Sequence, residues 1–381
     1  MLEHCRDACT IQFHDFADML LHHDDEAAHS VWERTEVNAL RVEPLDEGSP
    51  LYSDIASFGG GVTKGALIDT AKNLGLAIRL GGTYFPLRDT AYKSLTDRAK
   101  IGGSSLPKLS RQILADTLNE CLALQKNAQA LLLIRSQKVS AVHSGDGSDY
   151  AILPINELLA AIKAKLDERF PGSAFDSGYS SHELTSAAWS LPGQKSDLLG
   201  SYHKTLDALG KTSLATKLMP GIRFSTSDTG IAAAKVSALL FGMAYPIPIG
   251  SMVGTEHRGR ATVADFMDSL DLLFAQFEDS VKRLEQLMDV YLTYPVNAMT
   301  AICKRLSLPK KASLDAIAMF EMANGGGSAT AHDVFFAMQE IMFLLKSEEV
   351  RTGKMLQLEE SMSRALSLNW AQYDYAKAVS W

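Results

Sequence analysis

The stretch VADFMDSLDLLFAQFEDSVKRLEQLMDVY, residues 263–291, carries the clearest structural pattern in this chain. Its large apolar residues recur at intervals of three or four positions, which is the spacing of one face of an α-helix. A helix of about 30 residues is roughly 45 Å long, too long for a small domain to cover alone. The pattern therefore predicts one long helix. Its apolar face contains Val263, Phe266, Leu270, Leu273, Phe277, Val281, Leu284, Met288 and Tyr291.

This apolar face allows two interpretations. It is either the spine onto which later helices, expected at 313–323, 331–346 and 356–368, pack within the chain, or part of it meets another subunit. On the second interpretation, Phe266, Leu270 and Phe277 form an oligomer interface and the protein is a homo-oligomer.

Upstream of the long helix, the apolar pattern changes to that of short strands. Residues 131–135 are a buried-strand candidate, residues 138–142 alternate, and turn-forming residues follow at 144–147. An amphipathic helix is predicted at 155–170, and residues 51–133 are interpreted as helices separated by glycine-containing breaks. Further strands are expected at 175–179, 183–191 and 222–227 and within 231–254.

These patterns together predict an α+β fold. Antiparallel β-hairpins pack against helices in the middle of the chain, and a mostly helical C-terminal region with one long helix follows. We divide the chain into an acidic, histidine-rich N-terminal segment (1–50), an α+β core (51–260) and a helical C-terminal region (261–381).

The net charge is unevenly distributed along the 381 residues. Lys and Arg number 37 against 45 Asp and Glu, which gives a formal charge of −8. Residues 1–50 contain three arginines and twelve acids, a net charge of −9, so the rest of the chain carries +1. Residues 72–138 hold eleven basic and four acidic residues, and residues 195–260 hold eight and four. The acidic average therefore does not exclude a nucleic-acid partner.

The N-terminal segment contains a helix candidate and five of the ten histidines. Ile11, Phe13, Phe16, Met19 and Leu20 are expected to share one face of that helix. The spacing of Cys5, Cys9 and His14 matches no common zinc pattern, so no metal site is predicted. An acidic arm beside a basic groove would compete with nucleic acid, which predicts tighter binding when residues 1–48 are deleted.

The sequence contains no complete nucleotide-binding or hydrolase motif. Gly210-Lys211-Thr212 resembles the end of a phosphate loop, but Thr205 stands where that motif needs glycine. There is no H-E-x-x-H, G-x-S-x-G or C-x-x-C motif. The pairs His182-Glu183 and Glu256-His257 are interpreted as surface or sheet-edge pairs. We therefore predict no cofactor and no catalytic residues, with an enzyme of unrecognised site kept as an alternative.

Basic residues recur beside aromatic residues between positions 202 and 260. A cationic groove with stacking aromatics is what sequence-tolerant binding of single strands requires, because phosphates supply affinity and every base offers a π-face. Ordinary solvated strand edges are the alternative interpretation. The predicted nucleic-acid contacts are Tyr202, Lys204, Lys211, Lys217, Arg223, Phe224, Arg258 and Arg260.

Cysteine usage and hydropathy predict a cytoplasmic protein. The four cysteines provide no disulfide framework, and the first 30 residues lack the apolar core of a secretory leader. The most apolar stretch, 231–250, contains Lys235, Pro246 and Pro248, which favours buried strands over a membrane span. No membrane partner is expected.

Several segments resemble the uncharacterised phage/plasmid-like protein family, which is carried by prophages, plasmids and other mobile elements. The resemblance covers roughly residues 50–375. One departure is Phe241-Gly242-Met243, where a Cys-Asn-Gly-like step is expected. The segments that carry it are 138–142, 150–154, 158–159, 185–189, 225–230, 257–259, 331–338 and 365–370.

The resemblance implies a genetic context and transfers no functional residue. The order of elements is also similar to that of phage single-strand annealing proteins, which is an analogy of fold. The leading hypothesis is a non-catalytic mobile-element protein that binds single-stranded DNA and promotes annealing or protects the strand. The alternatives are a structural or protein-interaction factor that assembles through its long helix, and an enzyme with an unrecognised site.

Overall fold

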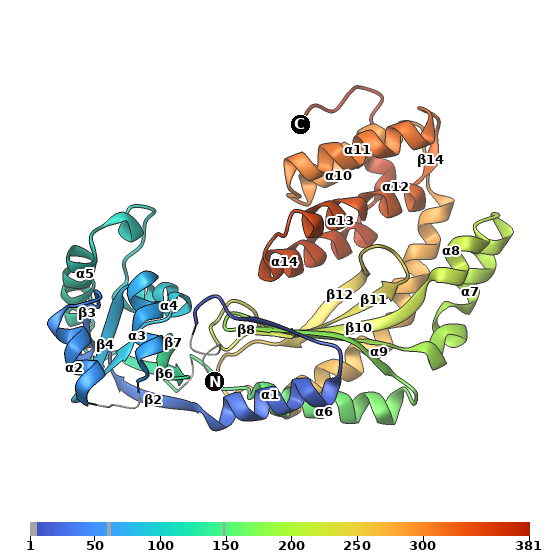
Figure 1. Ribbon diagram of the computed structural model, residues 1–381. Helices are drawn as coiled ribbons and strands as arrows, with labels where there is room; N and C mark the ends of the chain where they lie inside the picture. The colour runs from blue at the N-terminus through green and yellow to red at the C-terminus, as the bar shows by residue number, and fades with distance from the viewer. Residues whose placement is uncertain (1–5, 59–61, 148) are drawn as a thin grey trace.

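A six-stranded antiparallel sheet forms the centre of the larger of two lobes (Figure 1). The computed structural model describes residues 6–58, 62–147 and 149–381. The strand order is β1-β8-β9-β10-β11-β12, and the chain has the predicted α+β class. The strands are β1 (Thr10–Phe13), β8 (Ala174–Ser181), β9 (Thr185–Ser190), β10 (Met219–Thr226), β11 (Ala234–Phe241) and β12 (Ile247–Thr255).

Helices cover both faces of this sheet, and side-chain alternation along β10 shows how. Phe224 points to one face, where its ring packs edge-on against Phe266 of α9 (Val263–Gln286) at 5.6 Å between centroids. Its neighbour Arg223 points to the other face and pairs with Glu359 of α14 (Thr352–Ser363). Helices α1 (Phe16–Ala28) and α6 (Ile155–Arg169) lie on the side opposite α14 (Figure 1).

The long helix predicted at 263–291 is α9, which is shorter than expected. It begins with a capping box, in which Thr262 Oγ1 accepts from the Asp265 N–H and Asp265 Oδ2 accepts from the Thr262 N–H. It ends at Gln286, and Tyr291 lies in the short strand β13 (Tyr291–Leu292). The apolar stripe therefore spans 24 helical residues and a following turn.

The predicted oligomer interface on this helix is wrong in placement. Phe266, Leu270 and Phe277 are buried in the core of their own chain, with at most 1% of each exposed. Because the sheet and neighbouring helices already cover these side chains, they present no surface to a second subunit in this structure. The spine interpretation is the one that the packing supports.

The C-terminal helices share one continuous core with the sheet. Trp370, Phe335 and Leu358 belong to the same buried cluster as Trp189 of β9 and Phe224 of β10. None of the helices among the described residues is long and apolar enough to cross a membrane. The remaining elements of this lobe are α7 (Lys195–Ala208), α8 (Thr212–Lys217), α10 (Pro295–Arg305), α11 (Lys310–Asn324), β14 (Ala329–Thr330), α12 (Ala331–Met338) and α13 (Glu340–Ser347).

The smaller lobe has its own hydrophobic clusters, built on two three-stranded antiparallel sheets. One sheet, β2-β6-β7, contains the predicted hairpin, and the other has the order β3-β4-β5. The lobe comprises β2 (Ser30–Glu36), β3 (Arg41–Pro44), α2 (Pro50–Phe58), α3 (Lys64–Lys72), β4 (Leu76–Leu80), β5 (Thr83–Pro86), α4 (Asp89–Ala99), α5 (Arg111–Ala123), β6 (Gln129–Arg135) and β7 (Lys138–Ser144).

Strands β4 and β5 correct the all-helical interpretation of residues 51–133. Two glycines, Gly81 and Gly82, separate them, and Gly81 has a φ of 57°. A positive φ in a two-residue connection is the signature of a tight hairpin turn. The double glycine marks this hairpin, and the interpretation as a helix break missed it.

The predicted domain boundary at residue 50 is also corrected, because residues 10–44 contribute one strand to each of the three larger sheets. Strand β1 pairs with β8, β2 with β6, and β3 with β4. The predicted helix is confirmed as α1, with Met19 buried, but Ile11 and Phe13 lie in β1. Deleting residues 1–48 would remove strands from these sheets, so the idea of a separable acidic arm is not supported.

Candidate nucleic-acid interface at the lobe junction

The two lobes are joined by a buried ion pair. Arg135, the last residue of β6, places Nη2 2.5 Å from Oδ2 of Asp228, which follows β10, and each side chain is 8% exposed. Although burial opposes the charge, Asp228 and Glu26 hold the pKa of Arg135 above its usual value. The Asp228 carbonyl oxygen accepts from His143 Nε2 at 2.7 Å and from the Tyr150 hydroxyl at 3.2 Å. Asp228 therefore joins the two lobes at one point.

Three aromatic rings stack at this point, two of them from nearby positions and one from more than 100 residues later in the chain. His143 of β7 lies 3.8 Å from Tyr150, centroid to centroid, with their planes within 9°. Tyr150 in turn stacks on His257, which follows β12, at 5.5 Å and 15°. Trp32 of β2 flanks the column at 5.7 Å from Tyr150 and 6.0 Å from His143. We call His143, Tyr150 and His257 the ring column.

Burial keeps both histidines of the column neutral near pH 7, although their hydrogen bonds to carbonyl oxygens oppose this effect. Burial lowers the pKa of His143 to about 4 and also lowers the pKa of His257. Because carbonyl oxygens only accept, His143 donates from Nε2 to Asp228, and His257 donates from Nδ1 to Ala151. His257 Nε2 then accepts from the Thr226 hydroxyl. The column is an uncharged aromatic stack in which Tyr150 is the partly exposed ring, and the neighbours of the two histidines set their tautomers.

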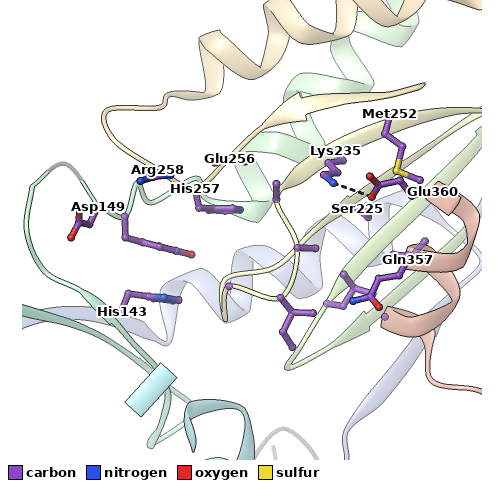
Figure 2. A pocket seen from close by; sticks show the side chains of 18 residues that line it. His143, Asp149, Ser225, Lys235, Met252, Glu256, His257, Arg258, Gln357 and Glu360 are labelled. Carbon is purple, nitrogen blue, oxygen red and sulfur yellow. Dashed lines mark hydrogen bonds and ion pairs between the residues drawn. The ribbon is translucent and has the colours of Figure 1, made fainter. Parts of the chain in front are cut away.

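Two adjoining cavities lie beside the ring column, and we call them the junction cavities. The first, of about 560 Å³, lies between the column, the α14 face of the sheet and α14 itself (Figure 2). The second, of about 370 Å³, extends along α4 and β7. Both are lined by His143, Asp149, Tyr150, Gly230 and Arg258.

Three cations on these walls have no carboxylate partner among the described residues. Lys93 and Arg98 come from α4, and Arg258 follows the ring-column residue His257. The Arg98 Nε atom is buried and has no hydrogen-bond partner among the described protein atoms. Lys235 is different, because its ammonium group already pairs with Glu360 at 3.2 Å. Arg98 and Arg258 are therefore the groups most suited to an anionic ligand.

The anionic side chains of the walls are Asp97, Asp149, Glu256 and Glu360. Glu360 is neutralised by Lys235 and Arg364, and Asp149 accepts from the Ser144 hydroxyl at 2.6 Å. Because a hydroxyl does not neutralise Asp149, the three acids Asp97, Asp149 and Glu256 equal in number the three cations that have no carboxylate partner in the described part of the chain, so the site is a local pattern of charge rather than a broad basic surface. An anionic ligand that binds here would place its negative charge at the two arginines.

Two of the predicted stacking residues are buried. Tyr202 and Phe224 are completely enclosed, and the Tyr202 hydroxyl lies 2.7 Å from His332 Nε2 of α12. Neither ring offers a face to a base in this structure, which corrects their predicted role. Both side chains stabilise the core of the larger lobe instead.

Two of the predicted phosphate contacts are already paired. Arg223 binds Glu359, and although burial opposes its charge, this carboxylate raises its pKa. The Lys211 ammonium lies 2.5 Å from the Asp333 carboxylate. The partners follow 136 and 122 residues later, so no local pattern indicates them.

The other predicted cations remain exposed but are not brought together. Lys204 lies on α7 and Lys217 on α8, and neither lines the junction cavities. Arg260 is exposed two residues beyond Arg258. Of the predicted set, only Arg258 lines both cavities. Some cations of the basic stretch at 72–138 are likewise not available to a ligand. Arg88 and Lys138 are fully buried, and Lys138 pairs with Asp7 and Asp69.

His182 and His257 are buried, which corrects their interpretation as surface residues, although His257 does follow β12, the edge strand of the sheet. His182 donates from Nε2 to the Arg6 carbonyl, and burial lowers its pKa to about 3. Neither histidine hydrogen-bonds a carboxylate among the described residues, so the pair that the enzyme alternative requires is not formed by them. Of the candidate zinc residues Cys5, Cys9 and His14, Cys5 lies outside the described residues.

Comparison with known proteins identifies no relative of this chain. The fold and the site define an α+β chain of two lobes with a polar and aromatic junction between them. No protein-family model matches the chain, and no curated protein or solved structure matches it. The resemblance to phage/plasmid-like proteins stays a prediction.

The site residues that the sequence pattern did not predict are His143, Tyr150, Lys93 and Arg98. A weak signal exists for the first two, since the turn-forming residues predicted at 144–147 lie between them in the sequence. Nothing local marks Arg98, because α4 reaches the ring column by packing against β7, which lies well downstream in the sequence.

Proposed function

We propose that this chain binds single-stranded nucleic acid in the junction cavities and performs no chemistry on it. One observation supports this most strongly: Arg98 and Arg258, without carboxylate partners among the described residues, flank an uncharged stack of aromatic rings. Phosphates bind arginine forks, and bases bind aromatic and apolar surfaces, so this combination fits a flexible single strand.

The size of the site fits a short run of nucleotides. Ligand pockets for small molecules are typically about 300–1,000 Å³, and the first junction cavity alone has about 560 Å³. The two cavities meet at the ring column, so a strand that crosses both passes Arg98 and Arg258 in turn. A duplex has its bases stacked inside and does not fit this arrangement.

We also propose the biological setting that the sequence resemblance implies. In that setting the chain is a mobile-element protein, and binding serves strand annealing or protection. DNA is the expected polymer, and an RNA strand of the same length is the comparison that tests this choice. The alternative function, assembly through the long helix, has no free apolar surface in this structure, because the apolar stripe on α9 is buried within the chain.

A paired set of variants tests the site against general electrostatics. Fluorescence anisotropy measures binding of a labelled single-stranded oligonucleotide at about 50 mM salt, where phosphate contacts are strong. The double variant Arg98→Ala/Arg258→Ala removes two cations from the cavities. The control Lys204→Ala/Lys217→Ala removes two exposed cations from α7 and α8, so its net charge equals that of the arginine double variant.

The arginine variant should weaken binding by at least about tenfold and lower the slope of log affinity against log salt by about 1.4, because two phosphates of a single strand are then no longer neutralised. The lysine variant should change affinity less than about twofold, since neither lysine lines the cavities. Absence of binding by the unaltered chain, or equal decreases for both double variants, contradicts the proposal.

A further inference from the structure

Helix α1 carries three metal-ligating side chains on one side. His22, His23 and Glu26 each present one ligand atom, and these atoms lie within 4.8 Å of one another. His23 and Glu26 are buried, and the His22 side chain is 10% exposed. The group is thus enclosed by protein but reachable from solvent.

The distances approach those of a zinc site. Ligands of tetrahedral zinc at about 2.0–2.2 Å stand roughly 3.3 Å from one another. Glu26 Oε2 lies 3.0 Å from His23 Nδ1 and 3.6 Å from His22 Nε2. Small side-chain rotations therefore suffice to bring the three atoms around one ion.

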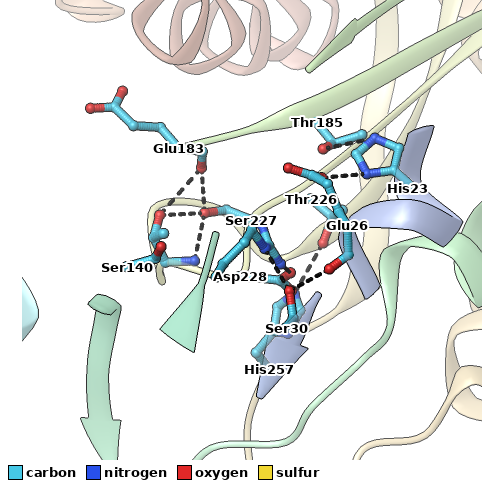
Figure 3. A network of polar contacts seen from close by, with 12 residues as sticks. His23, Glu26, Ser30, Ser140, Glu183, Thr185, Thr226, Ser227, Asp228 and His257 are labelled. Atoms are coloured by element: carbon cyan, nitrogen blue, oxygen red, sulfur yellow. Dashed lines mark hydrogen bonds and ion pairs between the residues drawn. The ribbon is translucent and has the colours of Figure 1, made fainter. Parts of the chain in front are cut away.

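The surroundings hold His23 in the orientation that a ligand needs. Its other ring nitrogen, Nε2, lies 3.4 Å from the Thr185 hydroxyl of β9, so His23 reaches from Glu26 on one side to Thr185 on the other (Figure 3). Outer hydrogen bonds of this kind fix the ring and leave the first nitrogen for metal.

A cavity supplies the open side of the group. His23 and Glu26 line a space of about 250 Å³ together with Ser30, Trp32 and Asp228. Arg135 also lines it, but its charge is engaged by Asp228. Two imidazoles and one carboxylate with an open position form the donor set of zinc sites that keep a bound water.

We propose that His22, His23 and Glu26 bind one Zn²⁺ ion, with water from the adjoining cavity completing its coordination. Nitrogen donors select zinc over magnesium, which prefers oxygen ligands. The site is independent of the proposed nucleic-acid binding, because it needs no strand and shares no residue with the junction cavities.

The test titrates the full-length, chelator-treated protein with Zn²⁺ in competition with a chromophoric zinc indicator. One equivalent should bind per chain, and Mg²⁺ should not displace it. Glu26→Gln and His23→Ala should each weaken binding by at least about tenfold. The matched control is His29→Ala, which removes an exposed histidine just beyond the same helix.

A second control separates this site from the cysteine-containing alternative. His14→Ala should leave zinc binding unchanged, whereas a site built from Cys5, Cys9 and His14 would lose it. If circular dichroism shows that a variant at a buried position does not fold, His22→Ala replaces it, because the His22 side chain is partly exposed. Absence of zinc binding by the unaltered chain, or equal weakening in His29→Ala or His14→Ala, overturns the proposal.

Discussion

Substitution of Asp228 by asparagine should destabilise the protein strongly, because Asp228 holds the buried charge of Arg135 at the lobe junction. The side chains are isosteric, and the Asp228 carbonyl, which serves His143 and Tyr150, is retained. The substitution therefore removes one negative charge and little else.

The expected magnitude follows from burial. Breaking a buried ion pair by removing one partner costs about 3–5 kcal/mol, because the other charge stays buried and uncompensated. Glu26 also raises the pKa of Arg135, so its carboxylate compensates part of the loss. We expect a decrease of about 3 kcal/mol in the free energy of unfolding at pH 7.

The assay is urea unfolding followed by far-ultraviolet circular dichroism and tryptophan fluorescence. Coincident transitions justify a two-state analysis, and the linear extrapolation gives the free energy. Asp167→Asn is the matched control, because it breaks the exposed pair of Lys163 and Asp167 and should cost less than about 1 kcal/mol. A decrease for Asp228→Asn no larger than that of the control refutes the view that this pair joins the lobes.

Two further predictions concern acid stability and the long helix. Folded His143 has a pKa of about 4, below its usual value, so the unfolded chain binds more protons and stability should fall as the pH drops from about 6.5 to 4. His143 alone contributes up to about 3 kcal/mol of this decrease, and urea midpoints of His143→Gln should therefore change less between about pH 7 and pH 4.5 than those of the unaltered chain. Leu270→Ala should cost about 2–5 kcal/mol of stability through the cavity that it leaves, with the mass measured by light scattering unchanged. A smaller assembly without a decrease in stability would instead restore the interface interpretation.

Local patterns predicted much of the secondary structure. The spacing of apolar residues from Val263 to Leu284 is a property of consecutive residues, so the helix was predictable without knowledge of its surroundings. The hairpin of β6 and β7 was predictable for the same reason. The pairing of β1 with β8 was not, because Thr10 and Ser181 are 171 positions apart and nothing in either strand specifies the other.

The candidate site was less predictable, because a charged residue in the sequence does not show which residue of opposite charge it will pair with in the fold. Arg223 and Lys211 look like free cations in the sequence, yet the fold brings Glu359 and Asp333 to them. Tyr202 and Phe224 are aromatic residues near basic ones, but the periodicity that places them on an inner face also fits core packing. Arg258 lines the site in the structure because the loop after β12 carries it to the ring column.

The most direct test of the central claim is photochemical cross-linking of the full-length protein to a single-stranded oligonucleotide that carries a photoactivatable thymidine. Mass spectrometry of the digested complex then locates the contacts. The account predicts cross-links in the peptides that contain Arg98, Tyr150 and Arg258, which line the junction cavities. Cross-links confined to residues 195–217 of α7 and α8, or none above those of an unrelated protein, would contradict it.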